Sequence, residues 1–218
     1  MLNNFHMSTV ASQPHPELTA KGWQVVVVDY NNASDLRFKV RGVDVVISTI
    51  NGTPQMRLID AAAAERVRRF IPSEFEGSPF SRPPNTFLDN GRRAALARLQ
   101  ECEAQGLRST VFTCGIFYER FAPGGMAAFQ IGVRNAIGGE GQYVLDMRQG
   151  RAMIPPSNGT GRPVHVCLTS ARDVARFVVA ALSLPSWPRE FRMRGERMTI
   201  AELVSIGEQL RGITNAMI

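Results

Sequence analysis

The chain has 218 residues, of which 44% are hydrophobic and 20% charged, as is ordinary for one globular α/β domain. No apolar run reaches the roughly 18 residues that span a bilayer, and no basic stretch precedes a long apolar one at the N-terminus, so neither a membrane span nor a secretory signal is expected. The three cysteines are widely spaced and odd in number, which favours a reducing compartment, and we expect a cytoplasmic location. The formal charge of +6 comes from scattered arginines, with no dense run and no nucleic-acid-binding motif, so nucleic acid is not an expected partner.

The first part of the chain shows no periodicity, and we expect residues 1–15 to be irregular. The run GWQVVVVDY predicts a strand over residues 24–29, and a short helix is expected over residues 36–41. Neither G-x-G-x-x-G nor G-x-x-G-x-x-G follows a predicted strand. The glycine turn that brings backbone N–H groups to a dinucleotide pyrophosphate is therefore not recognised.

Residues 42–77 predict one β-α-β unit. A β-branched run over residues 44–49 indicates a buried strand, which Asn51 and Gly52 end. Thr53 can cap the following helix, with Pro54 in its first turn. Residues 69–71 predict the second strand. Because open parallel sheets bind ligands beyond the carboxyl ends of their strands, we expect a pocket at residues 48–52, 72–75 and 114–118.

The rest of the chain continues the alternation of helices and strands. We expect a helix over residues 91–105, strands over 110–114 and 164–168, and a hairpin-like pair over 143–147 and 151–154. Two further helices have N-terminal capping boxes, Ser170 with Asp173 and Thr199 with Glu202. These elements predict an α/β fold with a mostly parallel sheet flanked by helices. We expect a single domain over residues 1–218, in which residues 116–164 and 185–218 contribute to a small C-terminal substrate lobe.

Several segments resemble, in order, the NmrA-like and isoflavone-reductase-like proteins, which are atypical relatives of the short-chain dehydrogenases/reductases. The segments are VDVVIST, RRFIPSEFEG, STVFTCGIFYERFAPGG, CLTSARDVARFVVAAL and GERMTIAELV. The resemblance extends from Pro16 to Gly212 and implies a Rossmann-like fold, NADP(H) or NAD(H) as the cofactor, and a small, natural-product-like substrate. Both ends of the chain look short beside the family.

The resemblance also implies which residues form the site. Those that would bind the cofactor are Asp29, Ser48, Thr49, Ile50, Asn51, Pro72, Ser73, Glu74 and Phe75, and those that would bind the substrate are Cys114, Gly115, Phe117 and Tyr118. Tyr118 is the candidate proton donor and Glu74 the candidate base. The alternatives are a pocket-wall role for Tyr118, local pairing or capping for Glu74, and a turn-forming role for Asp29.

The lysine that acts in isoflavone-reductase-like enzymes aligns with Ala94 or Ala95, and the two lysines of this chain, Lys21 and Lys39, lie elsewhere. The Tyr-x-x-x-Lys pattern is also absent after Tyr118. Arg92 and Arg93 lie near the lysine position but cannot replace it in proton transfer, since a guanidinium stays charged. They either hold an anionic group or lie on an exposed helix face. The histidines and cysteines show no metal-ligand spacing, so no metal is expected.

Four functions stay open at this point. They are an NAD(P)H-dependent reductase, a non-catalytic dinucleotide-sensing regulator, a non-redox rearrangement or cyclisation enzyme, and an inactive truncated family member. The missing lysine weakens the first, and the missing glycine turn weakens the first two. We therefore expect weak or lost cofactor binding, and either direct pairing of strand 24–29 with strand 44–49 or strands supplied by an oligomer. A homo-oligomer or a protein partner is a further expectation.

Overall fold

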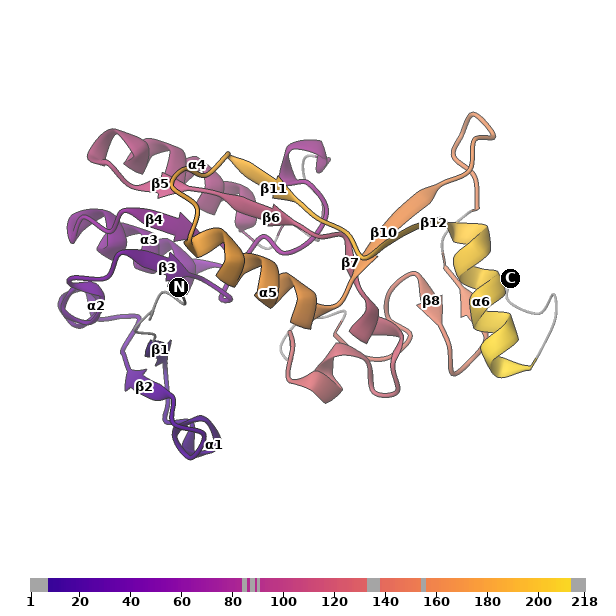
Figure 1. The fold of residues 1–218 in the computed structure, drawn as a ribbon, viewed down its shortest axis with the longest axis horizontal. Coiled ribbons are helices and arrows are strands. Elements are labelled where there is room, and N and C mark those ends of the chain that lie inside the picture. The colour runs from indigo at the N-terminus through magenta and orange to yellow at the C-terminus, as the bar shows by residue number, and fades with distance from the viewer. Residues whose placement is uncertain are drawn as a thin grey trace. The chain divides into compact units, whose positions relative to one another are not determined.

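The computed structural model describes residues 8–83, 86, 89, 91–132, 138–153 and 156–212 (Figure 1). The chain divides into two compact units. Unit 1 holds Met1–Glu74, Pro79–Phe112 and Ser183–Phe191, and unit 2 holds Phe75–Ser78, Thr113–Leu182 and Arg192–Ile218. The division differs from the predicted lobe, because residues 165–182 fall in unit 2 and residues 185–191 fall in unit 1.

A three-stranded parallel sheet forms the centre of unit 1, in the order β3-β4-β5. The elements are β3 (Val45–Ile47), α3 (Thr53–Ala64), β4 (Arg69–Ile71), α4 (Arg92–Cys102) and β5 (Arg108–Ser109). Ile47 lies opposite Ile71, so β3 and β4 end together. The β-α-β unit expected from residues 42–77 is thus confirmed, and so is the helix after it, whose last predicted turn is a 3-10 turn at Glu103–Gln105.

One hydrophobic core lies between this sheet and its helices. α2 (Ala33–Val40) packs on α3, and α3 packs on α4. Leu36, Ile59, Phe70 and Leu99 are fully buried in this core. Burying one such side chain contributes about 1.5–3 kcal/mol, so this packing holds the carboxyl ends of β3 and β4 in place.

Two short strands precede the central sheet. β1 (Ser8–Ala11) pairs in parallel with β2 (Gln24–Val27), and the one-turn helix α1 (Pro16–Thr19) joins them. The expectation of an irregular stretch over residues 1–15 is therefore wrong at Ser8–Ala11, whose four residues are too few to show a period. The expected direct pairing of β2 with β3 is also wrong, because β1 and β2 form a sheet of their own (Figure 1).

A further strand pair, whose residues up to Phe112 and Phe191 belong to unit 1, joins distant parts of the sequence. β6 (Val111–Thr113), where a strand was expected over residues 110–114, pairs with β11 (Glu190–Arg192). The rings of Phe112 and Phe191 lie 5.1 Å apart, centroid to centroid. The Thr110 hydroxyl donates to the Pro188 carbonyl at 2.6 Å. These contacts fix the segment that follows α5 onto unit 1.

Unit 2 is built on β10 (His165–Thr169), which pairs in parallel with β7 (Ile116–Phe117) and antiparallel with β12 (Glu196–Thr199). The predicted hairpin is confirmed as β8 (Leu145–Asp146) with β9 (Arg151–Ala152). α5 (Ala171–Leu182) and α6 (Ile200–Arg211) complete the unit.

The predicted caps of α5 and α6 are present. The Asp173 N–H donates to the Ser170 hydroxyl at 3.0 Å, and Thr199 with Glu202 forms the full capping box. After Gly124 the chain forms a 3-10 turn over Gly125–Phe129. Within the described part of the chain, every helix is too short or too polar to cross a bilayer.

Candidate functional site

The loop after β3 begins beside the end of β4. The Ser48 N–H donates to the Ile71 carbonyl at 2.8 Å, and the buried Ser48 hydroxyl accepts from the Ile50 N–H at 3.4 Å. Ser48 therefore shapes the loop, whereas Thr49 is exposed and Asn51 half-buried. The predicted residues 48–51 and 72–74 come together at this edge of unit 1.

The start of α3 differs from the prediction. Gly52, at φ 66°, is the N-cap residue, and the helix begins at Thr53, so Thr53 does not cap it. A left-handed φ suits glycine, which has no Cβ to clash with the backbone. Among the described residues, apart from Gly52, its chain neighbours and the backbone of its own helix, no heavy atom lies within 4 Å of the position that a Cβ on Gly52 would take. The backbone at the N-terminus of α3 thus faces open space.

Gln55 of α3 links this helix to the loop after β4. Its side chain is fully buried, and its Oε1 accepts from the Ser73 N–H at 2.8 Å. Its Nε2 has no hydrogen-bond partner among the described residues. Leaving a buried donor unpaired costs about 1–3 kcal/mol, so a ligand oxygen there would be stabilised. Gln55 is absent from the site expected from the sequence; a glutamine on the buried face of an alanine-rich helix is the signal that could have shown it.

The N-terminus of α4 lies against the same loop. A Cβ on its N-cap residue, Gly91, would lie 3.5 Å from the Cα of Gly52. Arg92, the first residue of α4, is only 7% exposed, and its Nε donates to Asn51 Oδ1 at 3.4 Å. Two helix N-termini and a buried guanidinium give this edge positive potential. The exposed-face alternative is therefore wrong for Arg92.

The neighbouring positions on α4 behave differently. Arg93 is exposed and donates to the carbonyls of Arg82 and Pro83 at 3.3 Å. Ala95, one of the two residues aligned with the family lysine, is buried in the core of unit 1, and Ala94 is exposed. Neither position carries a proton-transfer group.

Glu74 is held in an ion pair. Its side chain is 1% exposed, its Oε2 lies 2.5 Å from Arg82 Nη2, and its Oε1 lies 3.4 Å from Arg82 Nη1. Arg82 Nη1 also lies 3.4 Å from Asp89 Oδ1. Because both carboxylate oxygens bond to one guanidinium, the geometry favours the local pairing role of Glu74 over that of a base.

Asp29 forms a turn after β2. Its Oδ1 accepts from the Asn31 N–H at 2.8 Å, and its own N–H donates to Asp35 Oδ2 at 3.0 Å. Arg57 of α3 donates to the Tyr30 carbonyl at 3.3 Å and bonds to Asn31 Oδ1 as well. The turn-forming role is therefore present, and the loop that carries Asp29 is attached to α3. A cofactor contact of Asp29 stays a prediction.

The predicted substrate residues lie in unit 2, and so does half-buried Phe75. Cys114 is fully buried, and burial raises the pKa of its thiol to about 12, so the thiol is neutral and packs like an apolar group. Thr169 Oγ1 donates to the Cys114 carbonyl at 2.6 Å. Gly115 has φ 76°, and a Cβ there would lie 2.2 Å from the Cys167 carbonyl oxygen. The close approach of the Gly115 and Cys167 backbones thus fixes the chain just before β7.

Tyr118 begins a 3-10 turn after β7, with Phe117 half-buried before it. Partial burial raises the pKa of the Tyr118 phenol, and the negative charges of Glu196 and Asp173 raise it further. The phenol is therefore protonated at neutral pH and is not activated as a phenolate. The next residue, Glu119, accepts from the Ala171 N–H at 2.9 Å and so caps α5. Among the described residues, no group of three His, Cys, Asp or Glu side chains could hold a metal ion.

A family model described as NAD(P)H-binding matches residues 4–129. The chain belongs to this NAD(P)H-binding family. A curated relative, oxidoreductase BOA1 of Botryotinia fuckeliana (strain B05.10), is 28% identical over 211 residues, which cover 90% of this chain and 64% of the relative. This chain thus spans less than two thirds of that relative's length.

Solved structures share the fold. Leucoanthocyanidin reductase from Vitis vinifera, in a ternary complex, superposes with a TM-score of 0.67 at 20% identity, over 96% of this chain and 67% of that one. AtPrR2 with NADP+ and (+)pinoresinol gives a TM-score of 0.66 at 21% identity, over 93% and 64%. The Rossmann-like α/β fold, the likeness to isoflavone-reductase-like proteins and the NAD(P)H-binding class are thereby confirmed.

Proposed function

We propose that this chain binds NAD(P)H at the carboxyl edge of β3 and β4. We further propose that it acts as an oxidoreductase that reduces a small, natural-product-like molecule. The observation that supports the binding place is the convergence of the Asn51–Gly52 loop, the N-terminus of α4 and the buried Arg92. The family supplies the cofactor class. The relatives named above are an oxidoreductase and reductases, which supports the reaction class.

The residues at this edge fit a dinucleotide. Arg92 and the two helix N-termini offer positive charge to a phosphate group, and the open backbone at Gly52 allows its close approach. The unpaired Gln55 amide offers a buried donor. Asp29, on the loop attached to α3, is the proposed contact on the adenine side. NAD(P)H supplies a hydride when bound, and the chain's part is to hold and orient it.

Reduction of a carbonyl also needs a proton, which we assign to Tyr118. Its raised pKa keeps the phenol protonated at neutral pH, so it can donate a hydrogen bond or a proton to a carbonyl oxygen. The same shift disfavours the phenolate that a donor leaves behind, so catalysis by this residue alone is slow. Glu74, paired with Arg82, acts by positioning the loop over residues 72–75.

A non-catalytic dinucleotide-binding regulator is the second candidate. The observation that favours it is that an alanine, Ala94 or Ala95, stands where the family lysine aligns, so α4 carries no proton-transfer group at that position. This candidate needs the same cofactor edge and no turnover.

Calorimetric titration with NADPH and with NADH, followed by NADPH oxidation assays on aromatic carbonyl and alkene compounds, tests both candidates. Binding with turnover supports the oxidoreductase, and binding without turnover supports the regulator. No heat of binding at about 1 mM of either nucleotide, where affinity corresponds to about −4 kcal/mol, would overturn both. A low-micromolar dissociation constant would contradict only the expected weak binding and would show that these residues suffice without the glycine turn.

A further inference from the structure

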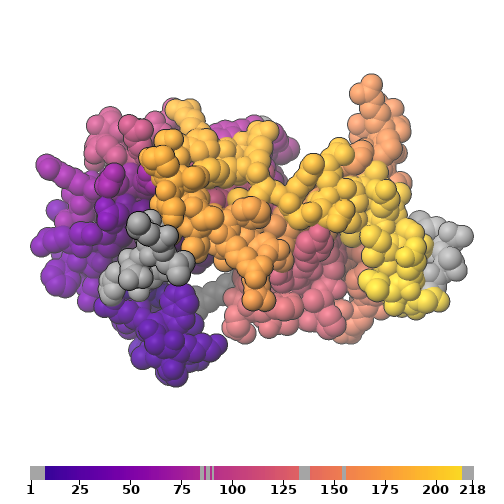
Figure 2. Space-filling model, in the orientation of Figure 1, coloured from indigo at the N-terminus to yellow at the C-terminus, as the bar shows by residue number. Residues whose placement is uncertain are grey.

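A cavity of about 320 Å³ lies at the amino-terminal ends of β4 and β5 in unit 1. Its lining combines the two strand starts, the turn after α4 and the segment after α5. The lining residues are Arg68, Arg69, Gly106, Arg108, Ser109, Pro185, Ser186 and Trp187. A volume of this order is enough for a small ligand. Figure 2 shows the segment after α5, in orange, beside the pink surface of unit 1.

Three of the lining residues are arginines, and none is acidic. Arg69 donates to the carbonyls of Leu184 and Pro185 at 3.2 and 2.9 Å, and its guanidinium lies 4.4 Å from the ring centroid of Trp187. These partners are neutral, so they fix the guanidinium and leave its charge uncompensated. Partial enclosure by Trp187 strengthens its attraction for an anion, because the local dielectric is lower than in water.

The other two guanidinium groups are available to a ligand. Arg108 is exposed, and its side chain has no hydrogen-bond or ion-pair partner in the part of the chain that the structure describes. Arg68 Nη1 lies 3.7 Å from Asp44 Oδ1, but both side chains are about three quarters exposed, so water screens this pair. The hydroxyl groups of Ser109 and Ser186 add donors to the same lining.

This cavity is distinct from the cofactor edge. Arg69 and Arg108 are the first residues of β4 and β5, whereas the cofactor edge follows Ile71, the last residue of β4. Parallel strands carry their starts and ends on opposite edges of the sheet. The two sites therefore share β4 but lie at its two ends.

We propose that this cavity binds a small molecule that carries a phosphate monoester group. Guanidinium groups match phosphate oxygens in paired hydrogen bonds, and three of them suit a dianion better than a singly charged carboxylate. Trp187 and Pro185 supply an apolar wall for the organic part of the ligand.

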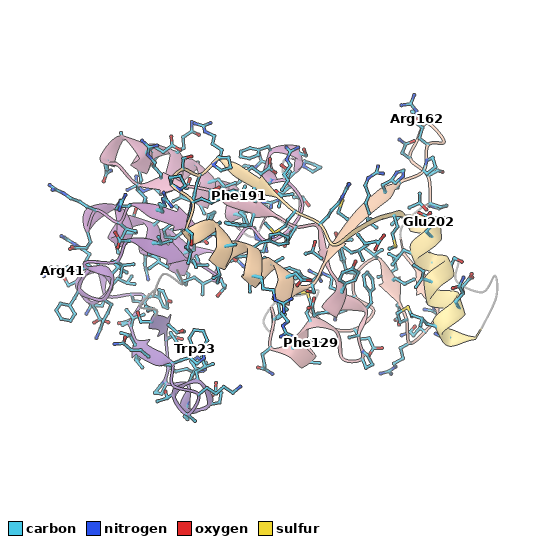
Figure 3. The ribbon with its side chains drawn as sticks, viewed as in Figure 1. Trp23, Arg41, Phe129, Arg162, Phe191 and Glu202 are labelled. Atoms are coloured by element: carbon cyan, nitrogen blue, oxygen red, sulfur yellow. The ribbon has the colours of Figure 1, made fainter. Side chains whose placement is uncertain are left out.

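Phenyl phosphate is the probe, and Trp187 is the reporter. The chain has two tryptophans, and the other, Trp23, lies just before β2 (Figure 3). In a Trp23→Phe protein, Trp187 alone reports binding. At fixed ionic strength, phenyl phosphate is expected to change the fluorescence of Trp187 in a saturable way. It is also expected to bind more tightly than benzoate. Arg108→Ala is expected to weaken binding about tenfold, as for one charged hydrogen bond.

Matched variants and a second ligand make the result decisive. Arg68→Ala, also at an exposed position, serves as a second lining variant and should likewise weaken the binding of phenyl phosphate. Arg162→Ala, on the loop before β10, should leave the affinity for phenyl phosphate unchanged. NADPH binding, measured by calorimetry, should be unchanged in Arg108→Ala. The proposal is overturned by a linear fluorescence response, by equal affinity for benzoate, by full affinity in both lining variants, or by parallel loss of NADPH binding.

Discussion

Arg92 Nε donates to Asn51 Oδ1 at 3.4 Å, and this contact joins the start of α4 to the loop that ends β3. The two residues are 41 positions apart in the sequence. Burying a guanidinium costs free energy unless its N–H groups are hydrogen-bonded. Arg92 donates to Asn51, and its positive charge also attracts an anion. This pair therefore places a buried cation at the proposed cofactor edge, where no glycine-rich turn was recognised.

The Glu74–Arg82 pair is expected to support stability. Arg82→Leu leaves the carboxylate of Glu74 buried without its bidentate partner, and such a loss costs about 3–5 kcal/mol. Urea unfolding measures the change in the free energy of unfolding. The double variant Glu74→Leu with Arg82→Leu should lose less stability than Arg82→Leu, because neither charge of this pair is then left without its partner. A loss below about 1 kcal/mol in Arg82→Leu, the size of a surface pair, would contradict this role.

Gly115→Ala is expected to destabilise unit 2 by more than its backbone conformation alone requires. The new Cβ would lie 2.2 Å from the Cys167 carbonyl oxygen. Gly42→Ala is the matched control, since Gly42 has the same φ of 76° and, among the described residues beyond its chain neighbours, no heavy atom lies within 4 Å of its Cβ position. The control should cost about 1–2 kcal/mol, and Gly115→Ala at least about 2 kcal/mol more. Equal melting temperatures for the two variants would show that the close approach does not exist.

The buried Cys114 thiol predicts a pH dependence of stability. Its folded pKa is raised from 9.0 to about 12, so the folded state holds the proton more tightly than the unfolded state. The stability that comes from the neutral thiol is complete below pH 9 and falls as the pH rises toward 12. The difference in unfolding free energy between the wild type and Cys114→Ala should be constant below pH 9 and shrink above it. A difference that grows between pH 9 and 11 would contradict the burial.

Much of the fold follows from local pattern, because the deciding residues are close in sequence. Val46 and Phe70 sit in short apolar runs that end at Asn51 and Pro72, and both runs are strands. The capping box of Thr199 and Glu202 is also local. The cap of α3 could not be predicted, because Gly52 takes a left-handed φ that leaves Thr53 inside the helix.

The parts of the site that the sequence missed depend on distant residues. Arg92 follows Gly91 and precedes Arg93 in a polar run, and only the approach of Asn51 makes it a buried cation. The partner of Glu74 comes from a loop without a periodic pattern. β1 is recognisable only through its pairing with β2. The burial of a charge and the pairing of a short strand depend on contacts between distant residues, so the local sequence pattern does not reveal them.

The most direct test of the cofactor edge is calorimetric titration of NADPH into the wild type, Arg92→Met and Arg93→Met. Methionine keeps an unbranched stem and removes the charge at either position, and thermal melts confirm that each variant is folded. We expect Arg92→Met to weaken NADPH binding about tenfold or more, Arg92→Lys to restore part of the affinity, and Arg93→Met to stay within about twofold of the wild type. Equal NADPH affinity of the wild type and a folded Arg92→Met would contradict the account, because the positive charge of Arg92 beside Asn51 would then have no part in cofactor binding.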